Sequence, residues 1–287
     1  MPVAQTASVS AAPRSALITG CSSGIGLDAA RTLAARGWRV LATCRDGADC
    51  ARLAEEGLES FPLDLACVES VAGAVAETLA RLGGAPDALF NNGAFAIPGA
   101  TEDLPRAALR EIFEVNLFGQ LDVTNRLLPA MRARGSGRIV MNSSVLGLVA
   151  APWRGAYVAS KFALEGLTDT LRLELAGSGI HVSLIEPGPI ATPFRAKAVP
   201  RFEKHIDWRA SAHAAAYEAT LIRRLYATDG RRDRFELAPA AVTAVLIRAL
   251  ESPRPRARYT VTTPAHVAAV LRRVLPARLL DRVVARG

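Results

Sequence analysis

The stretch from Ser15 to Gly26 reads SALITGCSSGIG, and it decides the fold of this 287-residue chain. A β-type run, SALIT, leads into a turn with three glycines, and a helical pattern of apolar residues follows directly. Glycines permit a tight strand-to-helix turn and let backbone N–H groups approach a pyrophosphate at the positive end of the helix. Strand, glycine turn and helix together indicate a dinucleotide site, although the glycines alone also fit an ordinary turn.

Beyond this turn, β-type runs alternate with helical stretches up to residue 186. This repetition predicts an α/β fold, a doubly wound parallel sheet of Rossmann type with helices on both faces. Ligands of such sheets bind at the carboxyl ends of the strands, so we expect the functional side chains directly after each strand. The predicted strands are 15–19 (SALIT), 38–43 (WRVLAT), 88–91 (ALFN), 138–143 (RIVMNS), 180–185 (IHVSLI) and 258–262 (RYTVT).

We expect a single dinucleotide-binding domain over 14–262, preceded by a flexible leader over 1–13. The alternation breaks between about 190 and 236, where several aromatic residues lie among many charges. That composition is typical of a lid over a substrate site, and an ordinary surface insertion fits it too. Residues 238–250 and those after Pro264 have helical patterns, so we predict a C-terminal amphipathic extension over 263–287.

Composition excludes several classes of protein. Half of the residues are hydrophobic and 22% are charged, which is enough apolar material for a packed core. Seven of the eight net positive charges lie in 252–287, whereas a nucleic-acid-binding protein spreads them over its folded face, so we expect no nucleic-acid partner. No run of 18 apolar residues free of charge predicts a spanning helix, and no signal-peptide block opens the chain.

The cysteines and histidines give no sign of a metal site. The four cysteines, which lie in the first quarter of the chain, form no CxxC pair, and the four histidines show no ligand spacing. Free thiols are typical of a cytoplasm-like compartment. We therefore expect a cytoplasmic protein without a metal.

Tyr157 and Lys161 lie four residues apart in a helical stretch, so the phenol and the ammonium share one face. A phenol titrates near pH 10, and a cation one helical turn away stabilises its anion and lowers its pKa. The pair therefore predicts an acid or base that works near neutral pH. Ser144 stands thirteen residues before Tyr157, at the end of a predicted strand.

These motifs resemble the short-chain dehydrogenase/reductase family. TGCSSGIG over 19–26 fits its TGxxxGxG motif, and NNGA over 91–94 is similar to its NNAG motif with Gly and Ala exchanged. Asn116, Ser144 and the YxxxK pair match its catalytic positions, and PGPIAT over 187–192 is similar to its PGxxxT segment. The resemblance covers about 15–192, with six motifs in family order.

The resemblance implies hydride exchange between a nicotinamide and a carbinol or carbonyl carbon, with Tyr157 giving or taking the proton of the oxygen. Ser144 then fixes the substrate oxygen, Lys161 lowers the pKa of Tyr157 and binds the nicotinamide ribose, and Asn116 holds a water of the proton relay. The implied cofactor contacts are Gly20, Ser22, Ser23, Gly24, Ile25, Gly26, Arg45, Asp64, Leu65, Asn91, Gly93, Tyr157, Lys161, Pro187, Gly188, Ile190 and Thr192.

The end of the second predicted strand bears on the choice of cofactor. An acid there holds the ribose hydroxyls of NAD, whereas an arginine accommodates the 2′-phosphate of NADP. If the strand ends at Cys44, the acid position is a cysteine and Arg45 follows it, which favours NADP. Asp46 is the competing residue, and it favours NAD.

The substrate is expected to be an apolar alcohol or ketone of steroid, retinoid or lipid type. The glycine turn, the segment from Glu186 to Pro189 and the segment from Pro255 to Tyr259 look similar to the hydroxysteroid and retinol dehydrogenase branch of the family. A 3-oxoacyl or small-ketone reductase is the alternative substrate class. A sensor or scaffold that binds NADP without turnover is the alternative function.

An apolar stripe begins the C-terminal extension, and its residues fall at helical spacing: Val267, Val270, Leu271, Val274 and Leu275. Such a stripe either docks on protein or, helped by nearby arginines, makes a peripheral membrane contact through 264–287. We also expect the chain to form a homodimer or homotetramer.

Overall fold

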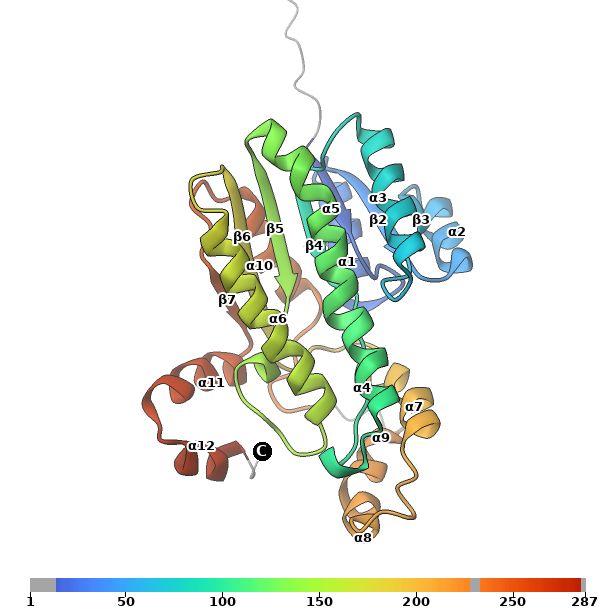
Figure 1. Ribbon diagram of the computed structural model, residues 1–287, viewed down its shortest axis with the longest axis vertical. Helices are drawn as coiled ribbons and strands as arrows, with labels where there is room; N and C mark the ends of the chain where they lie inside the picture. The colour runs from blue at the N-terminus through green and yellow to red at the C-terminus, as the bar shows by residue number, and fades with distance from the viewer. Residues whose placement is uncertain (1–13, 228–232, 285–287) are drawn as a thin grey trace, which may run out of the picture.

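The computed structural model describes residues 14–227 and 233–284, and its centre is a seven-stranded parallel sheet (Figure 1). The strand order is β3-β2-β1-β4-β5-β6-β7, which confirms the predicted doubly wound fold. The predicted leader over 1–13 lies outside the described residues. The strands are β1 (Ser15–Ile18), β2 (Arg39–Cys44), β3 (Glu59–Pro62), β4 (Ala88–Asn91), β5 (Gly137–Asn142), β6 (Ile180–Pro187) and β7 (Arg258–Val261).

Strand β3 is not predicted from the sequence, because it has no continuous apolar run. Its residues Glu59, Ser60, Phe61 and Pro62 pair with β2 at the edge of the sheet, and only Phe61 is buried. An edge strand exposes part of its surface and tolerates proline, so neither its composition nor its pattern stands out in the sequence. The six predicted strands are confirmed, with ends that differ by at most two residues.

Helices cover both faces of the sheet. On β1, Leu17 and Ile18 point to opposite faces, and each belongs to a different apolar cluster. Helices α1 and α10 pack on the face of Ile18, while α3, α5 and α6 pack on the face of Leu17 and lie in front of the sheet in Figure 1. The longer helices are α1 (Gly24–Ala35), α2 (Gly47–Glu55), α3 (Val68–Leu82), α4 (Arg106–Phe113), α5 (Gly119–Arg134), α6 (Gly155–Glu174), α7 (Phe194–His205), α10 (Ala240–Glu251), α11 (Thr263–Val274) and α12 (Ala277–Val284).

The predicted lid is helical and packs beside the carboxyl ends of the strands. Besides α7 it contains the short helices α8 (Ala214–Ala216) and α9 (Arg223–Leu225) and a π-helical turn over Tyr217–Ile222. Tyr217 is fully buried, and its hydroxyl accepts a hydrogen bond from Ala100 N at 2.6 Å and donates one to Asp103 Oδ2 at 2.7 Å. The lid is thus joined to the loop after β4. Residues 228–232 of the predicted lid lie outside the described residues.

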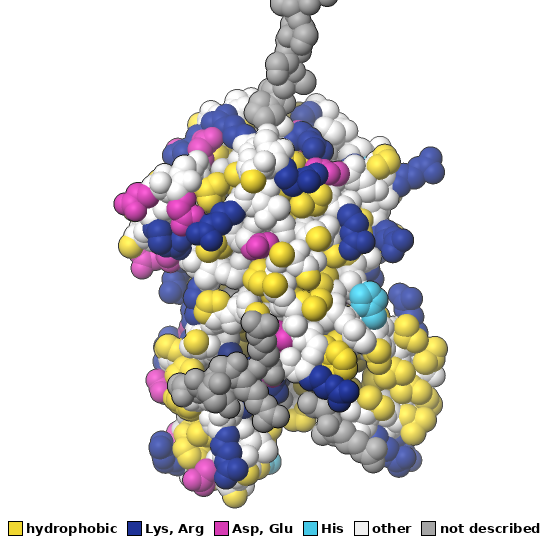
Figure 2. Space-filling model, turned by 180° about the vertical axis from the view of Figure 1, so that it is seen from behind, with side chains coloured by type: hydrophobic (Ala, Val, Ile, Leu, Met, Phe, Trp, Pro, Cys, Tyr) yellow, Lys and Arg dark blue, Asp and Glu magenta, His cyan; other side chains and the backbone are white. Residues whose placement is uncertain are grey.

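The C-terminal helices α11 and α12 extend from the other side of the same end of the sheet (Figure 1). On α11, Val267, Val270 and Val274 are 48%, 59% and 65% exposed, so the described part of the domain leaves the predicted stripe largely uncovered. Figure 2 shows the apolar side chains gathered over this region, at the lower right of the view. Within 14–227 and 233–284, every helix is too short or too polar to cross a membrane.

Candidate active site

The glycine turn between β1 and α1 lies against the loop that follows β4. Gly20 and Gly24 have φ angles of 73° and 59°, and a Cβ atom on Gly20 would lie 2.7 Å from Gly93 Cα. A Cβ atom on Gly26 would lie 2.3 Å from the carbonyl oxygen of Gly20. These contacts leave no space for larger residues, and they keep backbone N–H groups open at the start of α1.

A polar network joins the two loops, and Asn92 is its central residue. Asn92 Nδ2 donates to the carbonyl oxygens of Thr19 and Gly20 at 3.0 and 3.2 Å, and Asn92 Oδ1 accepts from Asn142 Nδ2 at 2.9 Å. The backbone N–H groups of Asn92 and Gly93 both donate to Thr19 Oγ1 at 2.9 Å. The end of β1 is therefore fixed to the ends of β4 and β5.

Asn91, which the resemblance implies as a cofactor contact that also braces the strand, has its side chain in the interior. Its side chain is fully buried, and Nδ2 donates to Thr124 Oγ1 at 2.9 Å and contacts Met141 Sδ. It thus braces β4 against α5 and β5. The neighbouring Asn92 is not predicted as a site residue. Alternation along a strand turns adjacent side chains to opposite sides, so Asn92 faces the glycine turn while Asn91 faces the interior.

The end of β2 places Arg45 and Asp46 in different settings. Cys44 is the last strand residue and is buried, and Arg45 follows it with an exposed side chain. Asp46 Oδ1 accepts a hydrogen bond from Ala48 N at 2.9 Å and caps α2. The carboxylate of Asp46 is therefore engaged locally, while the side chain of Arg45 has no hydrogen bond or ion pair with residues 14–227 or 233–284.

Asp64 and Leu65 lie in the loop after β3. Asp64 Oδ1 accepts from Ala66 N at 3.0 Å, as in a local turn. Leu65 is buried, and its side chain packs against Gly93 near the glycine turn. Both residues thus border the region where the strand ends meet.

The segment after β6 covers the start of α1. A Cβ atom on Gly188 would lie 2.1 Å from Thr262 Oγ1, so this glycine permits a close approach to the end of β7. Ile190 forms an isolated bridge with Leu237, and the methyl group of Thr192 would lie 2.9 Å from a Cβ atom on Gly24. Pro187 ends β6 and directs the chain into this segment.

Tyr157, Ser144 and Lys161 meet at the carboxyl end of β5. Tyr157 and Lys161 are buried on α6, and the Tyr157 hydroxyl lies close enough to Ser144 for that hydroxyl to lower its pKa. Ser144 Oγ also accepts from Leu146 N at 3.1 Å, which fixes its orientation. Lys161 Nζ donates to the carbonyl oxygen of Asn142 at 2.7 Å and lies 5.7 Å from the centre of the Tyr157 ring.

The charge state of this pair differs from the expectation. Burial raises the pKa of Tyr157 to about 12, against a smaller lowering by the hydrogen bond to Ser144. Burial also lowers the pKa of Lys161 to about 8, against a smaller opposing effect of Glu165. The predicted lowering of the Tyr157 pKa by Lys161 is therefore wrong for the protein alone, because desolvation disfavours the charged form of each group.

Asn116 lies in a π-helical turn over Glu114–Phe118, a feature that is frequent at functional sites. Its Oδ1 accepts from Phe95 N at 3.0 Å and its Nδ2 donates to Phe95 O at 2.9 Å. Nδ2 also contacts Ser160 Oγ at 3.1 Å. Asn116 is fully buried and joins the loop after β4 to the helix of Tyr157.

A cluster of ion pairs joins α6, the helix of Tyr157 and Lys161, to the neighbouring strands β6 and β7. Arg258 on β7 forms ion pairs with Glu165 and Asp169 of α6 and, at 2.6 Å, with Glu186 of β6. Burial raises the pKa of Glu165, and the arginine opposes this effect. Glu165 lies one helical turn after Lys161, so this cluster borders the site directly.

A family model described as short chain dehydrogenase matches residues 14–202. The chain belongs to the short-chain dehydrogenase/reductase family. It is an NAD(P)-dependent oxidoreductase that acts on CH–OH groups, which confirms the predicted enzyme class.

Three known proteins illustrate the similarity. The chain is 42% identical to the uncharacterized oxidoreductase YbbO of Escherichia coli K12 over 94% of both chains. It is 39% identical to human retinol dehydrogenase 8 over 66% of this chain and 63% of that protein. A short-chain dehydrogenase structure from Streptomyces avermitilis matches with a TM-score of 0.76 and 30% identity, covering 96% of this chain and 94% of that one.

The residues at the strand ends fit the dinucleotide that this family uses. The close packing of Gly20 on Gly93 exposes backbone at the turn, and α1 begins there with an N-cap serine, Ser23, whose side chain makes no capping bond. This arrangement provides the backbone N–H groups and the helix end that bind a pyrophosphate. Within the described residues, no three acidic, histidine or cysteine side chains are grouped as metal ligands.

The buried lysine predicts a pH dependence of stability. The ordinary lysine pKa is 10.5, so between pH 8 and 10.5 the unfolded chain retains a proton that the folded chain has released. Stability should therefore rise with pH in this window, by about 3 kcal/mol for a shift of this size. In Lys161→Met this contribution is absent.

Chemical denaturation of the cofactor-free protein at pH 7 and at pH 10.5 measures the effect. We expect the unfolding free energy of the wild type to gain about 3 kcal/mol on that of Lys161→Met between the two pH values. Lys204→Met, which changes an exposed lysine, is the control and should track the wild type. Parallel pH profiles for Lys161→Met and the wild type would contradict the assignment.

Proposed function

We propose that the protein is an NADP-dependent oxidoreductase that transfers a hydride between the nicotinamide and an apolar alcohol or its carbonyl. The observation that carries this proposal is the buried Tyr157 hydroxyl beside Ser144 in apolar surroundings. Phe194 of α7 packs on the Tyr157 ring with centroids 5.5 Å apart, and Phe95 and Ile97 belong to the same apolar cluster. A site of this kind favours a substrate with an apolar body and one polar oxygen.

When bound, the nicotinamide supplies or accepts the hydride, and the protein's residues manage the proton. Ser144 Oγ is oriented by Leu146 N and holds the substrate oxygen beside the Tyr157 hydroxyl. Tyr157 starts as a protonated acid, because burial raises its pKa to about 12, so it donates its proton when a carbonyl is reduced. Lys161, held at Asn142 O, places a positive charge near the phenol and stabilises the phenolate that results.

The preference for NADP rests on Arg45. Its side chain is exposed directly after β2, where a 2′-phosphate is recognised, while the carboxylate of Asp46 is engaged in capping α2. A free guanidinium forms strong bonds to a phosphate. The similarity to retinol dehydrogenase 8 supports the apolar substrate class.

A Tyr157→Phe variant tests the enzyme against the sensor or scaffold that binds NADP without turnover. We expect the variant to bind NADPH like the wild type and to lose about 10²- to 10⁴-fold in kcat, because it has no exchangeable proton. Tyr226→Phe changes an exposed phenol and is the matched control. A wild type that binds NADPH and turns over no steroid, retinoid or long-chain alcohol, 3-oxoacyl thioester or small ketone would favour the sensor.

The substrate class is tested on the same panel. Steroids, retinoids and long-chain lipids should give a higher kcat/KM than 3-oxoacyl thioesters, small ketones and polar sugars. Turnover confined to small polar substrates would contradict an apolar substrate.

An Arg45→Ala variant tests the cofactor. We expect the Kd for NADPH to rise about tenfold or more, because a charge-assisted bond to phosphate is lost, and the Kd for NADH to stay within about twofold. Asp46→Asn is the comparison, since it alters the neighbouring side chain and should leave the preference for NADPH unchanged. A loss of NADH affinity in Asp46→Asn, with Arg45→Ala unchanged, would indicate NAD as the cofactor.

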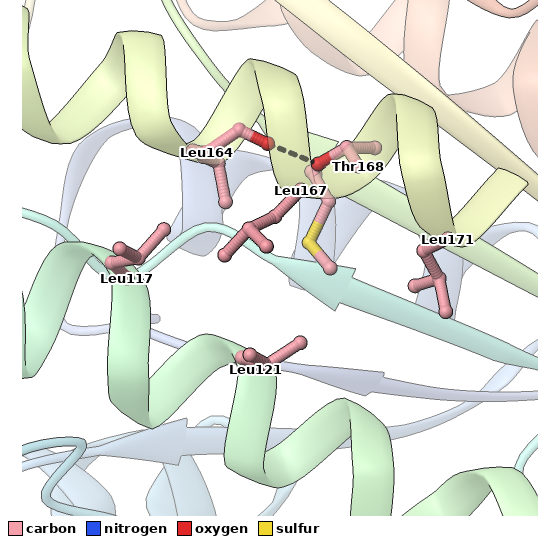
Figure 3. A pocket seen from close by; sticks show the side chains of 7 residues that line it. Leu117, Leu121, Leu164, Leu167, Thr168 and Leu171 are labelled. Carbon is pink, nitrogen blue, oxygen red and sulfur yellow. Dashed lines mark hydrogen bonds between the residues drawn. The ribbon is translucent and has the colours of Figure 1, made fainter.

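We also propose that the chain forms a homodimer or homotetramer and that α5 and α6 supply a contact between copies. An apolar hollow lies between these helices and is lined mostly by leucines, as Figure 3 shows. Leu167, which lines this hollow, is 41% exposed, and Phe118, the residue after Leu117 in the lining, is 50% exposed. This exposed apolar face is suited to a symmetric contact with a second copy.

The uncovered stripe on α11 supports a different contact, with an anionic membrane surface. Its valines are half to two-thirds exposed, and Leu279 and Val283 on α12 are 44% and 49% exposed. Exposed arginines flank both helices, so the apolar face is accompanied by charges that attract anionic lipid headgroups. We propose a peripheral location of the otherwise cytoplasmic protein on this basis. The arginines are Arg273, Arg278 and Arg282, while Arg272 Nη1 donates to the carbonyl oxygen of Gly147 at 3.2 Å and lies over the ring of Phe162.

Flotation with phosphatidylglycerol vesicles tests the membrane contact. We expect the wild type to float and Val270→Glu/Val274→Glu to lose most of this binding, while Val68→Glu, at an exposed position of α3, behaves like the wild type. Sedimentation without vesicles should give the same oligomer for all three proteins. A change of mass in the α11 variant alone would show that the stripe covers a second copy instead.

A further inference from the structure

A lysine of α7 reaches back to the glycine turn at the start of the chain. Lys197 Nζ donates to Ser23 Oγ at 2.7 Å and to Ser22 Oγ at 3.1 Å. Both serines belong to the turn that leads into α1, and Ser23 is the N-cap residue of that helix. The lid thus places an ammonium at the point where the backbone of the turn is open.

The surroundings of Lys197 differ from those of the other cations on α7. Arg195 pairs with Asp233 at 2.7 Å, and Lys204 pairs with Glu111 at 2.7 Å. For Lys197, no carboxylate of the described residues lies within 4 Å. Its partners are two neutral hydroxyls, which are weaker acceptors for an ammonium than an anion is.

Other positive groups gather around the same turn. Arg52 donates to the carbonyl oxygen of Ser22 at 2.9 Å. Arg45 is close enough to Arg201, one turn after Lys197 on α7, for its charge to lower the pKa of Arg201 after the larger effect of burial. The N-terminus of α1 adds the positive end of a helix dipole. Arg52 is itself paired with Asp49 and Glu56, so an anion at this point offsets chiefly the charge of Lys197 and the helix end.

From this geometry we propose that Lys197 binds a phosphate of the dinucleotide and thereby couples the position of α7 to cofactor binding. When the cofactor is bound, Lys197 Nζ exchanges the serine hydroxyls for a phosphate oxygen. The inference rests on the NAD(P) dependence of the family. If Lys197 binds the 2′-phosphate rather than the pyrophosphate, the inference rests in addition on the proposed preference for NADP.

The coupling has a direct consequence for the substrate site. Phe194, which packs on the Tyr157 ring, lies three residues before Lys197 on the same helix. An ion pair between Lys197 and the cofactor therefore holds the aromatic cover over the reacting phenol. We expect cofactor binding to precede productive binding of an apolar substrate.

Binding of NADPH and NADH to the full chain, measured by isothermal titration calorimetry, tests the inference. We expect Lys197→Met to weaken binding by about tenfold at low salt, and Lys197→Arg to retain it within about threefold. Lys204→Met removes the same charge from the same helix at an ion pair with Glu111, and it should bind like the wild type. Added NaCl should weaken the wild type more steeply than Lys197→Met, because screening acts on the bond that the variant lacks.

The two cofactors distinguish the two phosphate groups. Equal weakening for NADPH and NADH places Lys197 at the pyrophosphate, whereas weakening for NADPH alone places it at the 2′-phosphate, and both results support the inference. Equal affinities of Lys197→Met and the wild type would overturn it while leaving the proposed function intact. If the wild type bound neither cofactor, the proposed function would fail together with this inference.

Chymotrypsin provides a readout that does not depend on activity, because α7 and its neighbours contain several aromatic residues. NADPH should protect the lid of the wild type and of Lys197→Arg from cleavage, and it should protect Lys197→Met much less at equal cofactor saturation. Equal protection in all three proteins would show that Lys197 does not couple α7 to the cofactor.

Discussion

The close approach of the glycine turn to the loop after β4 is the constraint on which the site depends. Gly20 touches Gly93 without room for a Cβ atom, and Asn92 closes the contact with bonds to both sides. Because these bonds join the ends of β1, β4 and β5, they set the distance between the turn and Tyr157. The sheet supplies the rigid base, but this small polar junction determines whether a dinucleotide and a phenol face one another.

The burial of Tyr157 and Lys161 acts on their protons in opposite senses. Desolvation keeps the phenol protonated and lowers the pKa of Lys161 only to about 8, so near neutral pH a protonated phenol lies beside a lysine that is still mostly charged. A nearby charge then has a large effect, since the surroundings are apolar and poorly screening. The reactivity of Tyr157 and Lys161 therefore depends on the charge of a ligand bound beside them as well as on the helix that carries both residues.

Most of the fold and the order of the site residues were predictable from sequence, because they depend on local patterns. Apolar runs marked six strands, and the spacing of Tyr157 and Lys161 placed both on one face of α6. The edge strand β3 has no such run. Asn92 and Lys197 act across the fold, and their partners at Thr19 and Ser23 are far away in the chain, so no local pattern indicated them. The pKa of Tyr157 was mispredicted for a similar reason: burial is a property of the packed protein.

The ion pairs of Arg258 link β7, the last strand of the sheet, to the helix that carries Tyr157 and Lys161. Glu165 and Asp169 of α6 and Glu186 of β6 surround this arginine, and Glu165 stands one turn from Lys161. During synthesis these carboxylates emerge well before their shared partner, which belongs to the last strand. Asp169 also pairs with Arg172 of its own helix, at 2.7 Å, so an unfinished chain lacks a counter-ion chiefly for Glu165 and Glu186 until β7 has been made. The charge balance around the helix of Tyr157 and Lys161 is in this way tied to a strand made about ninety residues later.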